Sequence, residues 1–469
     1  MISMSVPSEK ELFPFQTTGV SEILRRKNVL LADEMGLGKT IEILCAINTI
    51  KPKRVLVVCP KSLTYNWRNE ARDWLLTHTL DEDFCIGTPS FCDPSQDFLI
   101  ASYEVVAQYA AVLKSQPWDW IILDEAHYIK NPSTKRFRGT KELITHFPDA
   151  KIIFATGTPI VNYPIELFPL LNLLDPARWS SSAAFERRYT YGGARRAYGR
   201  NLPELQSVLR ESVMIRRLKK EVLPELPTKR RQVIEFPSDG FDELLAEEMK
   251  IFEGSKRKSS SVDMLTERIL EMNAAGAVEG ETDWSSIIDE LKYDKHYFFE
   301  EMARVRHLVA QAKLPFIFSH IDDVLESHKN GEKLVVFAHH KDILHEIAHH
   351  IQEFLNDNNS VEILEGATQL EARQGAVDKF QKQEFPKVLV CGLKVAGHGY
   401  NMTRADHVIF AELDWVPGVI TQAEDRLHRI GQENKILVQH LTIQNSLDSY
   451  MAKKIVAKQK QINKTINRL

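Results

Sequence analysis

Short, largely apolar runs recur in both halves of this chain and alternate with longer stretches of helical pattern. The runs cover residues 29–32, 55–59, 98–101, 121–123 and 152–155, and then residues 334–338, 361–364, 388–391, 407–411 and 437–441. Strands that are covered by helices on both faces are continuously apolar in this way. The pattern therefore predicts an α/β protein with two parallel sheets.

The two sets of runs also predict how the chain is divided. Residues 172–332 lie between them and are largely charged and helical in pattern. Within this stretch, the polar residues 254–261 and the Gly/Ala/Glu-rich residues 274–282 are expected to be flexible loops. We expect a RecA-like lobe at residues 1–171, a helical insertion and linker at 172–332, a second RecA-like lobe at 333–445 and a basic C-terminal helix at 446–469.

The residues after the first apolar run have the composition of a phosphate-binding loop. They read Asp33-Glu34-Met35-Gly36-Leu37-Gly38-Lys39-Thr40 and lead into an apolar helical stretch. The glycines let backbone N–H groups and the helix N-terminus face the phosphates, Lys39 reaches the β and γ oxygens, and the Thr40 hydroxyl ligates Mg²⁺. The sequence matches the usual motif G-x-x-x-x-G-K-[ST] except at the first glycine, where Asp33 stands. These residues are expected to bind ATP.

Two adjacent acids follow the apolar run at 121–123. We expect Asp124 to hold Mg²⁺ through water, and Glu125 to orient and deprotonate the attacking water. The alternative is a buried strand that ends in a polar turn, with the acids capping a helix. Beside a phosphate loop, hydrolysis of ATP with Mg²⁺ is the better interpretation.

Arg426 and Arg429 are three residues apart, and we expect them to share one face of a helix. Their guanidinium groups stay ionised and suit the charge that develops on a transferring phosphoryl group. The alternative is an ordinary surface helix with Glu424/Arg426 or Asp425/Arg429 contacts. The upstream motifs favour catalytic arginines that the second lobe supplies to the ATP site.

Length and composition describe a globular protein with more than one core. The chain has 469 residues, of which 43% are hydrophobic and 26% are charged, so we expect two or three domains. No apolar run approaches the roughly 20 residues of a membrane span, and the N-terminus lacks the apolar core of a secretory signal. Five cysteines without C-x-x-C spacing favour a reduced intracellular setting. That setting would be the cytoplasm of a prokaryote or virus-infected cell, or a eukaryotic nucleus.

The net charge of −4 argues neither for nor against nucleic acid, but basic residues are clustered. The clusters are residues 51–54, 216–220, 229–231, 256–258 and the acid-free tail 453–468. A single cluster is more often a solvated face than a binding site. Several clusters on one ATPase favour a phosphate backbone as partner.

An ordered series of motifs runs through the chain. It consists of residues 14–16, DEMGLGKT at 33–40, residues 59–62 with Trp67 and Glu70, residues 101–104, DEAH at 124–127, and residues 155–159, 396–403 and 422–432. This series resembles the motif set of SNF2-family ATPases in helicase superfamily 2, and it spans about residues 12–460. Residues 195–205, 214–223, 226–227 and 336–341 are most similar to the HARP-like or annealing-helicase subgroup.

The resemblance implies roles at the matching positions. Gln16 matches the adenine-reading glutamine, and aspartate is common in the family at the position of Asp33. Gly399 and Gln422 lie in matched motifs and are expected to contact ATP. Lys39, Thr40, Asp124 and Glu125 match the phosphate, Mg²⁺ and water positions, Arg426 and Arg429 match the arginine fingers, and the candidates for contacts with DNA phosphates are Lys61, Ser102, Lys130 and Thr403.

The resemblance further implies a monomeric two-lobed motor that tracks along double-stranded or branched DNA and remodels or anneals it, in DNA repair. Phosphate contacts of this kind carry little sequence information. Two alternatives stay open: a strand-separating DNA or RNA helicase, and a nucleotide-gated scaffold that binds DNA or protein without processive motion. Because no recognition module flanks the motor, we expect targeting to be absent or supplied by a protein partner.

One rival motif is His345-Glu346-Ile347-Ala348-His349, which satisfies the zinc-protease pattern H-E-x-x-H. Spacing places no third ligand, and the preceding strand matches the helicase-like series. We expect both histidines to face solvent or a domain surface, because the buried stripe of this helix is formed by its apolar residues, Ile343, Leu344, Ile347, Ile351, Phe354 and Leu355. We therefore do not expect a metalloprotease.

Overall fold

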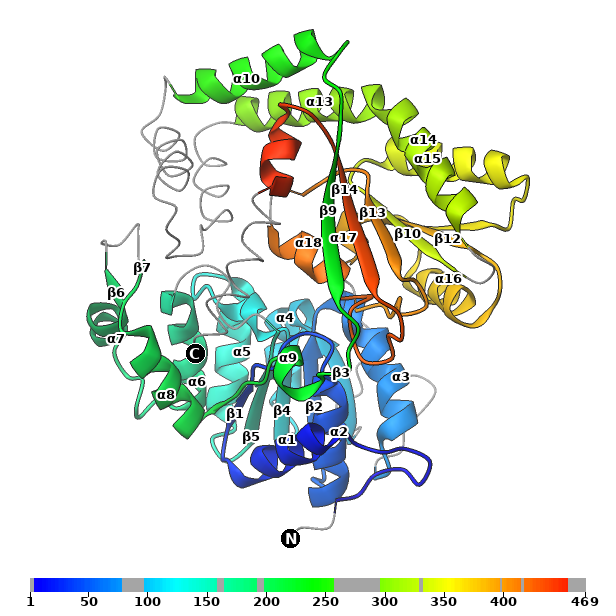
Figure 1. Ribbon diagram of the computed structural model, residues 1–469. Coiled ribbons are helices and arrows are strands. Elements are labelled where there is room, and N and C mark those ends of the chain that lie inside the picture. The colour runs from blue at the N-terminus through cyan, green and yellow to red at the C-terminus, as the bar shows by residue number, and fades with distance from the viewer. Residues whose placement is uncertain are drawn as a thin grey trace. The chain divides into compact units, whose positions relative to one another are not determined.

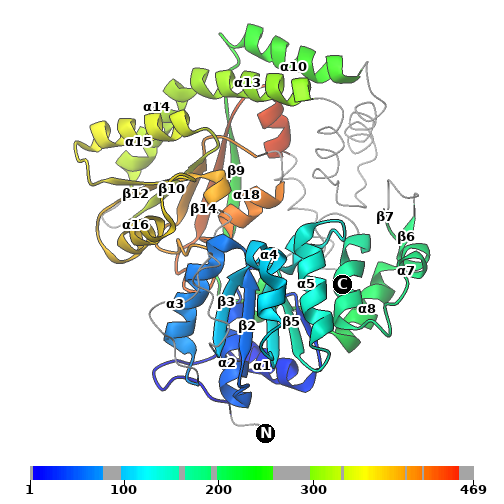
Figure 2. The same ribbon diagram turned by 180° about the vertical axis from the view of Figure 1, so that it is seen from behind.

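The structure is a computed structural model, and it describes residues 4–77, 97–157, 164–191, 198–256, 296–328, 332–396, 399–414 and 417–453. The chain divides into two compact units, Met1–Leu226 and Pro227–Leu469, and each contains its own parallel sheet (Figure 1 and Figure 2). No helix within the described ranges is long and apolar enough to cross a membrane.

Among the described residues, six strands form the sheet of the first unit in the order β3-β2-β4-β5-β1-β8, and all neighbouring pairs are parallel. Both β2 and β3 are buried along their whole length, which explains why their sequences do not alternate with polar residues. The strands are β1 (Val29–Leu31), β2 (Val55–Cys59), β3 (Phe98–Ser102), β4 (Trp120–Asp124), β5 (Lys151–Ala155) and β8 (Met214–Ile215).

Helices cover both faces of this sheet, and successive strand residues point to opposite faces. Val55 and Val57 pack against α1 (Pro14–Arg25), α2 (Lys39–Ile50) and α3 (Thr64–Trp74). Leu56 and Val58 pack into the other cluster, with residues of α4 (Tyr103–Leu113), α5 (Lys135–His146), α6 (Phe168–Leu174) and α8 (Leu202–Ser212). The short elements around them are η1 (Lys61–Leu63), η3 (Ala126–Ile129), η4 (Pro164–Leu167), α7 (Ser182–Tyr189), β6 (Thr190–Tyr191), β7 (Tyr198–Gly199) and α9 (Lys219–Val222).

The second unit repeats this plan. Six described strands have the order β11-β12-β10-β13-β14-β9, again with every neighbouring pair parallel. They are β9 (Lys229–Phe236), β10 (Leu334–Ala338), β11 (Val361–Leu364), β12 (Val388–Gly392), β13 (His407–Phe410) and β14 (Ile436–Ile443). One face packs on α14 (Leu314–Ser327) and α15 (Lys341–Leu355), and the other on α16 (Leu370–Lys382), α17 (Leu393–Ala396) and α18 (Pro417–Glu424). The helices α10 (Asp242–Lys256) and α13 (His296–Ala312) pack on each other beside them.

The predicted fold class is confirmed: each unit is a RecA-like parallel sheet between helices. Each of the ten apolar runs forms a strand at its predicted position, within one or two residues at the ends. The predicted domain bounds stay a prediction. Four described strands fall inside residues 172–332: β6 and β7 pair with each other, β8 joins the first large sheet and β9 joins the second. Residues 447–453 are helical as expected, whereas residues 254–256, which were expected in a flexible loop, form the end of α10. Residues 257–261, 274–282 and 454–469 lie outside the described part of the chain.

Candidate active site

The phosphate loop connects β1 to α2 and depends on two left-handed glycines. Gly36 has φ 81° and Gly38 has φ 83°, a backbone region in which a Cβ atom is strained. Gly38 is also the N-cap of α2, and a Cβ there would collide with the Gln16 amide. The loop therefore requires glycine at position 38, and its curl brings Lys39 and Thr40 into the first turn of α2.

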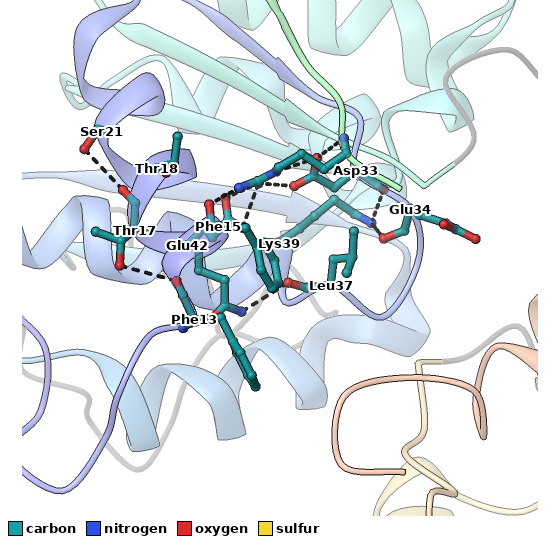
Figure 3. A network of polar contacts seen from close by, with 12 residues as sticks. Phe13, Phe15, Thr17, Thr18, Ser21, Asp33, Glu34, Leu37, Lys39 and Glu42 are labelled. Atoms are coloured by element: carbon teal, nitrogen blue, oxygen red, sulfur yellow. Dashed lines mark hydrogen bonds and ion pairs between the residues drawn. The ribbon is translucent and has the colours of Figure 1, made fainter. Parts of the chain in front are cut away.

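Lys39 contacts the backbone of this loop (Figure 3), and Gln16 does so too. The Lys39 ammonium donates to the carbonyl oxygens of Asp33, at 2.9 Å, and Glu34, at 3.4 Å. Gln16 is buried, and its amide donates to Leu37 O at 3.1 Å. Its side-chain oxygen accepts from the Phe13 N–H at 3.0 Å. Gln16 is thus joined to the loop expected to bind the phosphates.

A buried ion cluster lies behind the loop. Asp33 and Glu42 are both fully buried, and both carboxylates pair with the guanidinium of Arg217. Burial and the nearby Asp33 charge raise the pKa of Glu42 to about 8, against the opposing effect of Arg217. The sequence predicted Asp33 as a loop residue but gave no role to Arg217 or Glu42, because the arginine is 184 residues away from Asp33.

The acids of the DEAH motif stand at the carboxyl end of β4. Asp124 Oδ2 accepts from the Trp67 indole N–H at 2.8 Å, and Oδ1 accepts from the Glu125 backbone N–H at 2.9 Å. Burial first, and then repulsion from Glu125, raise the pKa of Asp124 to about 6, while the Trp67 bond and the Lys39 charge act in the opposite direction. The phosphate loop follows β1 and the DEAH turn follows β4, so both predicted halves of the nucleotide site lie at the carboxyl edge of the same parallel sheet.

Glu125 adopts a left-handed conformation with φ 49°, which is strained for a residue with a Cβ atom. Its carboxylate lies 3.2 Å from His127 Nδ1 and accepts from the Thr156 hydroxyl at 3.4 Å. The His127 ring nitrogen is also 3.1 Å from Thr156 Oγ1. Neither His127 nor Thr156 was among the predicted site residues, although both belong to motifs that were identified.

The prediction that Arg426 and Arg429 share a helix face is wrong. The helix α18 ends at Glu424, and residues 425–430 form turns. Arg426 is buried, and its carbonyl accepts from the Met402 N–H at 3.0 Å. Arg429 is half-buried. The two arginines therefore lie in one turn of the second unit, which the sequence period could not distinguish from a helix.

The last residue of the helix, Glu424, and its neighbour Asp425 pair with a strand that is far away in sequence. Glu424 is fully buried and accepts from Arg231 Nε at 2.7 Å, and its carboxylate lies 2.8 Å from the Lys229 ammonium. Burial opposes its ionisation, but the two cations outweigh burial and hold the pKa of Glu424 below its usual value. Asp425 lies 3.4 Å from Lys229. Glu424 and Asp425 thus pair with cations of β9, which the sequence did not predict.

The remaining predicted residues occupy varied environments. Gly399 is buried with φ 69°, and Gln422 is half-buried in α18. Of the predicted DNA contacts, Lys61 is exposed, Lys130 pairs with Glu166 at 2.8 Å, and the Thr403 hydroxyl accepts from Gln381 at 3.2 Å. Ser102 is buried, and its hydroxyl accepts from the Val105 N–H at 3.3 Å as the N-cap of α4. The structure thus gives the Ser102 side chain a capping role.

The H-E-x-x-H residues form no metal site. The side chains of His345 and His349 are 54% and 70% exposed. Among the described residues, no group of three or more His, Cys, Asp or Glu side chains could hold a metal ion. The buried stripe of α15 consists of Ile343, Leu344, Ile347, Ala348 and Ile351, whereas Phe354 is exposed.

Two family models match this chain: the SNF2-related domain over residues 15–287, and the helicase conserved C-terminal domain over residues 317–431. The Xenopus tropicalis SWI/SNF-related matrix-associated actin-dependent regulator of chromatin subfamily A-like protein 1 is 32% identical over 453 residues, which cover 94% of this chain and 43% of that protein. The Mus musculus DNA annealing helicase and endonuclease ZRANB3 is 31% identical over 477 residues, with 97% and 41% coverage. The chain thus spans less than half the length of these two relatives.

A solved structure, the Sulfolobus solfataricus SWI2/SNF2 ATPase core in complex with dsDNA, aligns with a TM-score of 0.42 at 22% identity. The alignment covers 97% of this chain and 99% of that chain.

Proposed function

Because this chain belongs to the SNF2-related family, whose domains imply ATP hydrolysis, we propose that it is a DNA-stimulated ATPase that translocates on double-stranded or branched DNA. The observation that carries this proposal is that the phosphate loop follows β1 and the DEAH turn follows β4, at the carboxyl edge of one parallel sheet. Burial and the Glu125 charge raise the pKa of Asp124, and the Lys39 charge acts in the opposite direction. To bind a nucleotide, the protein needs only the loop. Hydrolysis also needs a positioned base, and Glu125 supplies one.

The oxygen donors of the first unit fit Mg²⁺. Thr40 offers a hydroxyl and Asp124 a carboxylate, which are the hard ligands that Mg²⁺ prefers. The ion keeps several waters and needs no cage of protein ligands, in agreement with the lack of any larger ligand cluster among the described residues. Bound Mg²⁺ would neutralise charge on the phosphate oxygens.

The side chains of the chain would then divide the work. Lys39, which donates to loop carbonyls, would turn its ammonium to the β and γ oxygens. Glu125 would accept the proton of the attacking water, with its carboxylate oriented by His127 and Thr156. Arg426 and Arg429 of the second unit would stabilise the charge that develops on the transferred group.

The proposed DNA partner is supported by one relative and by three residues of this chain. ZRANB3 is named as a DNA annealing helicase, and that description concerns a protein more than twice the length of the matched region. In this chain, Lys61 begins η1 after β2, and Lys130 follows η3, the turn after β4. Thr403 offers a hydroxyl in the second unit. We infer that these groups contact phosphates, so binding would be independent of base sequence. Remodelling or annealing of the duplex would be the outcome.

ATP turnover with different nucleic acids tests the proposal. We expect duplex or branched DNA to raise hydrolysis many-fold above single-stranded DNA and RNA. Glu125→Gln should lower kcat by about 10²- to 10⁴-fold, the usual contribution of general acid–base catalysis, while ATP binding persists. Glu142→Gln is the matched control, because Glu142 is a surface carboxylate of the same unit with 57% exposure. Unchanged turnover in Glu125→Gln would exclude this residue as the base.

The same assays separate the alternatives. If single-stranded DNA or RNA stimulates ATP hydrolysis more strongly than duplex DNA does, and the strands of a duplex are separated, the protein is a strand-separating helicase. ATP hydrolysis without displacement of a triplex-forming strand from duplex DNA would identify a nucleotide-gated scaffold. That the motor works as a monomer with a separate targeting partner stays a prediction.

A further inference from the structure

The first residues of the phosphate loop are held by a segment that comes from the far end of the first unit. Hydrogen bonds run from Leu30 N to Val213 O at 2.8 Å, from Ala32 N to Ile215 O at 2.7 Å and from Glu34 N to Arg217 O at 3.1 Å. The segment that contains β8 thus continues beyond the strand and lies beside the first two loop residues. Lys219 N adds a bond to the Glu34 carboxylate at 2.7 Å.

The side chain of Arg217 adds a second layer to this attachment. Its Nε donates to Asp33 Oδ1 at 3.0 Å, its Nη2 pairs with Asp33 Oδ2, and its backbone N–H donates to Asp33 Oδ1 at 2.7 Å. The same Nη2 donates to both oxygens of Glu42, at 2.8 and 2.7 Å. The planar guanidinium is therefore shared between two carboxylates, a geometry that the single ammonium of lysine cannot reproduce.

The packing around this cluster leaves little room for another arrangement. Arg217 lies over the Phe15 ring, 5.3 Å from its centroid, and donates to the Phe15 carbonyl. A Cβ atom on Gly19 would collide with Glu42 and with the guanidinium. Both carboxylates are fully buried. A buried bidentate pair held on all sides fixes the orientation of Asp33 more tightly than a surface pair could.

Asp33 is also the residue whose carbonyl accepts from Lys39. The Lys39 ammonium lies 2.9 Å from Asp33 O and 3.4 Å from Glu34 O. A chain of contacts therefore leads from Arg217 to the Asp33 carboxylate, through the backbone of Asp33 and Glu34, to the side chain expected to meet the phosphates. We propose that Arg217 is a positioning residue, which sets the loop conformation from which Lys39 binds ATP. This proposal rests on the proposed function of the loop.

The side-chain contacts of Arg217 can be removed without removing its backbone hydrogen bonds. The bonds from Glu34 N to Arg217 O and from Arg217 N to Asp33 Oδ1 involve the Arg217 backbone, so they survive a change of side chain. Arg217→Gln removes the guanidinium and leaves the strand pairing in place. Arg217→Lys keeps the charge without the fork. Arg25→Gln is the control, because Arg25 pairs only on the surface, with Glu22, and its side chain is 64% exposed.

Binding of a fluorescent ATP analogue and steady-state ATP hydrolysis at saturating duplex DNA test the proposal in the full chain. A misplaced Lys39 weakens the binding of the nucleotide equally in the ground state and in the transition state. We therefore expect Arg217→Gln to raise Kd and KM about tenfold or more, with kcat changed less than about threefold. Arg217→Lys should lie between Arg217→Gln and the wild type, and Arg25→Gln should match the wild type. A purely structural role would instead lower the fraction of active molecules and leave Kd and KM unchanged.

A double-variant comparison tests whether Arg217 acts through Asp33. If it does, Arg217→Gln combined with Asp33→Asn should raise KM no more than about twofold beyond Asp33→Asn alone, because residues that act as one unit are not additive. Effects that multiply would overturn the proposal, as would an unchanged Kd in folded Arg217→Gln. If that variant does not fold, an unchanged Kd in Arg217→Lys serves the same purpose. A wild-type chain that binds ATP without hydrolysing it would overturn the proposed function and leave the Kd comparison valid.

Discussion

Replacing Glu424 with glutamine should destabilise the second unit strongly, although the two side chains have nearly the same shape. Glu424 is fully buried and faces two cations, Arg231 at 2.7 Å and Lys229 at 2.8 Å. The amide can still accept one hydrogen bond, but it cannot neutralise these charges. Breaking a buried ion pair by removing one partner costs about 3–5 kcal/mol. Since Asp425 still offers a carboxylate to Lys229 at 3.4 Å, we expect about 3 kcal/mol.

Urea unfolding combined with hydrogen exchange measures this effect where it arises. Peptides that cover Lys229–Phe236 and Ile436–Ile443 report on the paired strands β9 and β14, and their protection should fall by the same free energy. The Glu424 pKa lies below its usual value near 4.5, so the stabilisation is present above that value and is lost as the pH falls through the folded-state pKa. The gap between wild type and Glu424→Gln should therefore close in acid.

Two further variants test whether the buried charge of Glu424 causes this loss of stability. Asp378→Asn removes a surface pair with Lys382, whose side chain is 74% exposed, and should cost less than about 1 kcal/mol. Adding Arg231→Met to Glu424→Gln removes one of the uncompensated cations, so the double variant should be more stable than Glu424→Gln alone. A cost for Glu424→Gln no larger than that for Asp378→Asn would refute the argument.

Three other changes test separate parts of the structure. Burial, with a smaller effect from the Asp448 charge, raises the pKa of Glu248 from 4.5 to about 7. The protonated Glu248 therefore stabilises the fold below pH 4.5, and this contribution is lost as the pH rises towards 7. In urea titrations, Glu248→Gln should reduce the fall in unfolding free energy over this pH range by up to ~3 kcal/mol. Ser102→Ala removes the N-cap of α4 and should lower the unfolding free energy by about 1 kcal/mol, and an unchanged urea midpoint would contradict the capping role. His345→Ala and His349→Ala should leave zinc content and ATP turnover unchanged, because both side chains are exposed; loss of a bound zinc ion on elemental analysis would revive the metal site.

The sequence alone predicted those strands and loops whose amino-acid pattern depends only on neighbouring residues in the chain. A strand covered on both faces must be apolar along its length, so the runs at Val55–Cys59 and Leu334–Ala338 identified β2 and β10 to the residue. The phosphate loop was equally visible, because glycine adopts the left-handed backbone of Gly36 and Gly38 without strain. These features need no knowledge of distant residues.

Tertiary structure alone decided which distant charges meet. Arg217 reaches Asp33, and Arg231 reaches Glu424, across 184 and 193 residues, and charge patterning along the chain cannot predict such pairs. The helix that was wrongly predicted through Arg426 ends beside one of these pairs. Helical spacing favoured a continuation, whereas buried contacts of Glu424 and Asp425 with β9 accompany the turn that follows Glu424. Local periodicity is a weak preference, and a buried charge must find its partner wherever the fold provides it.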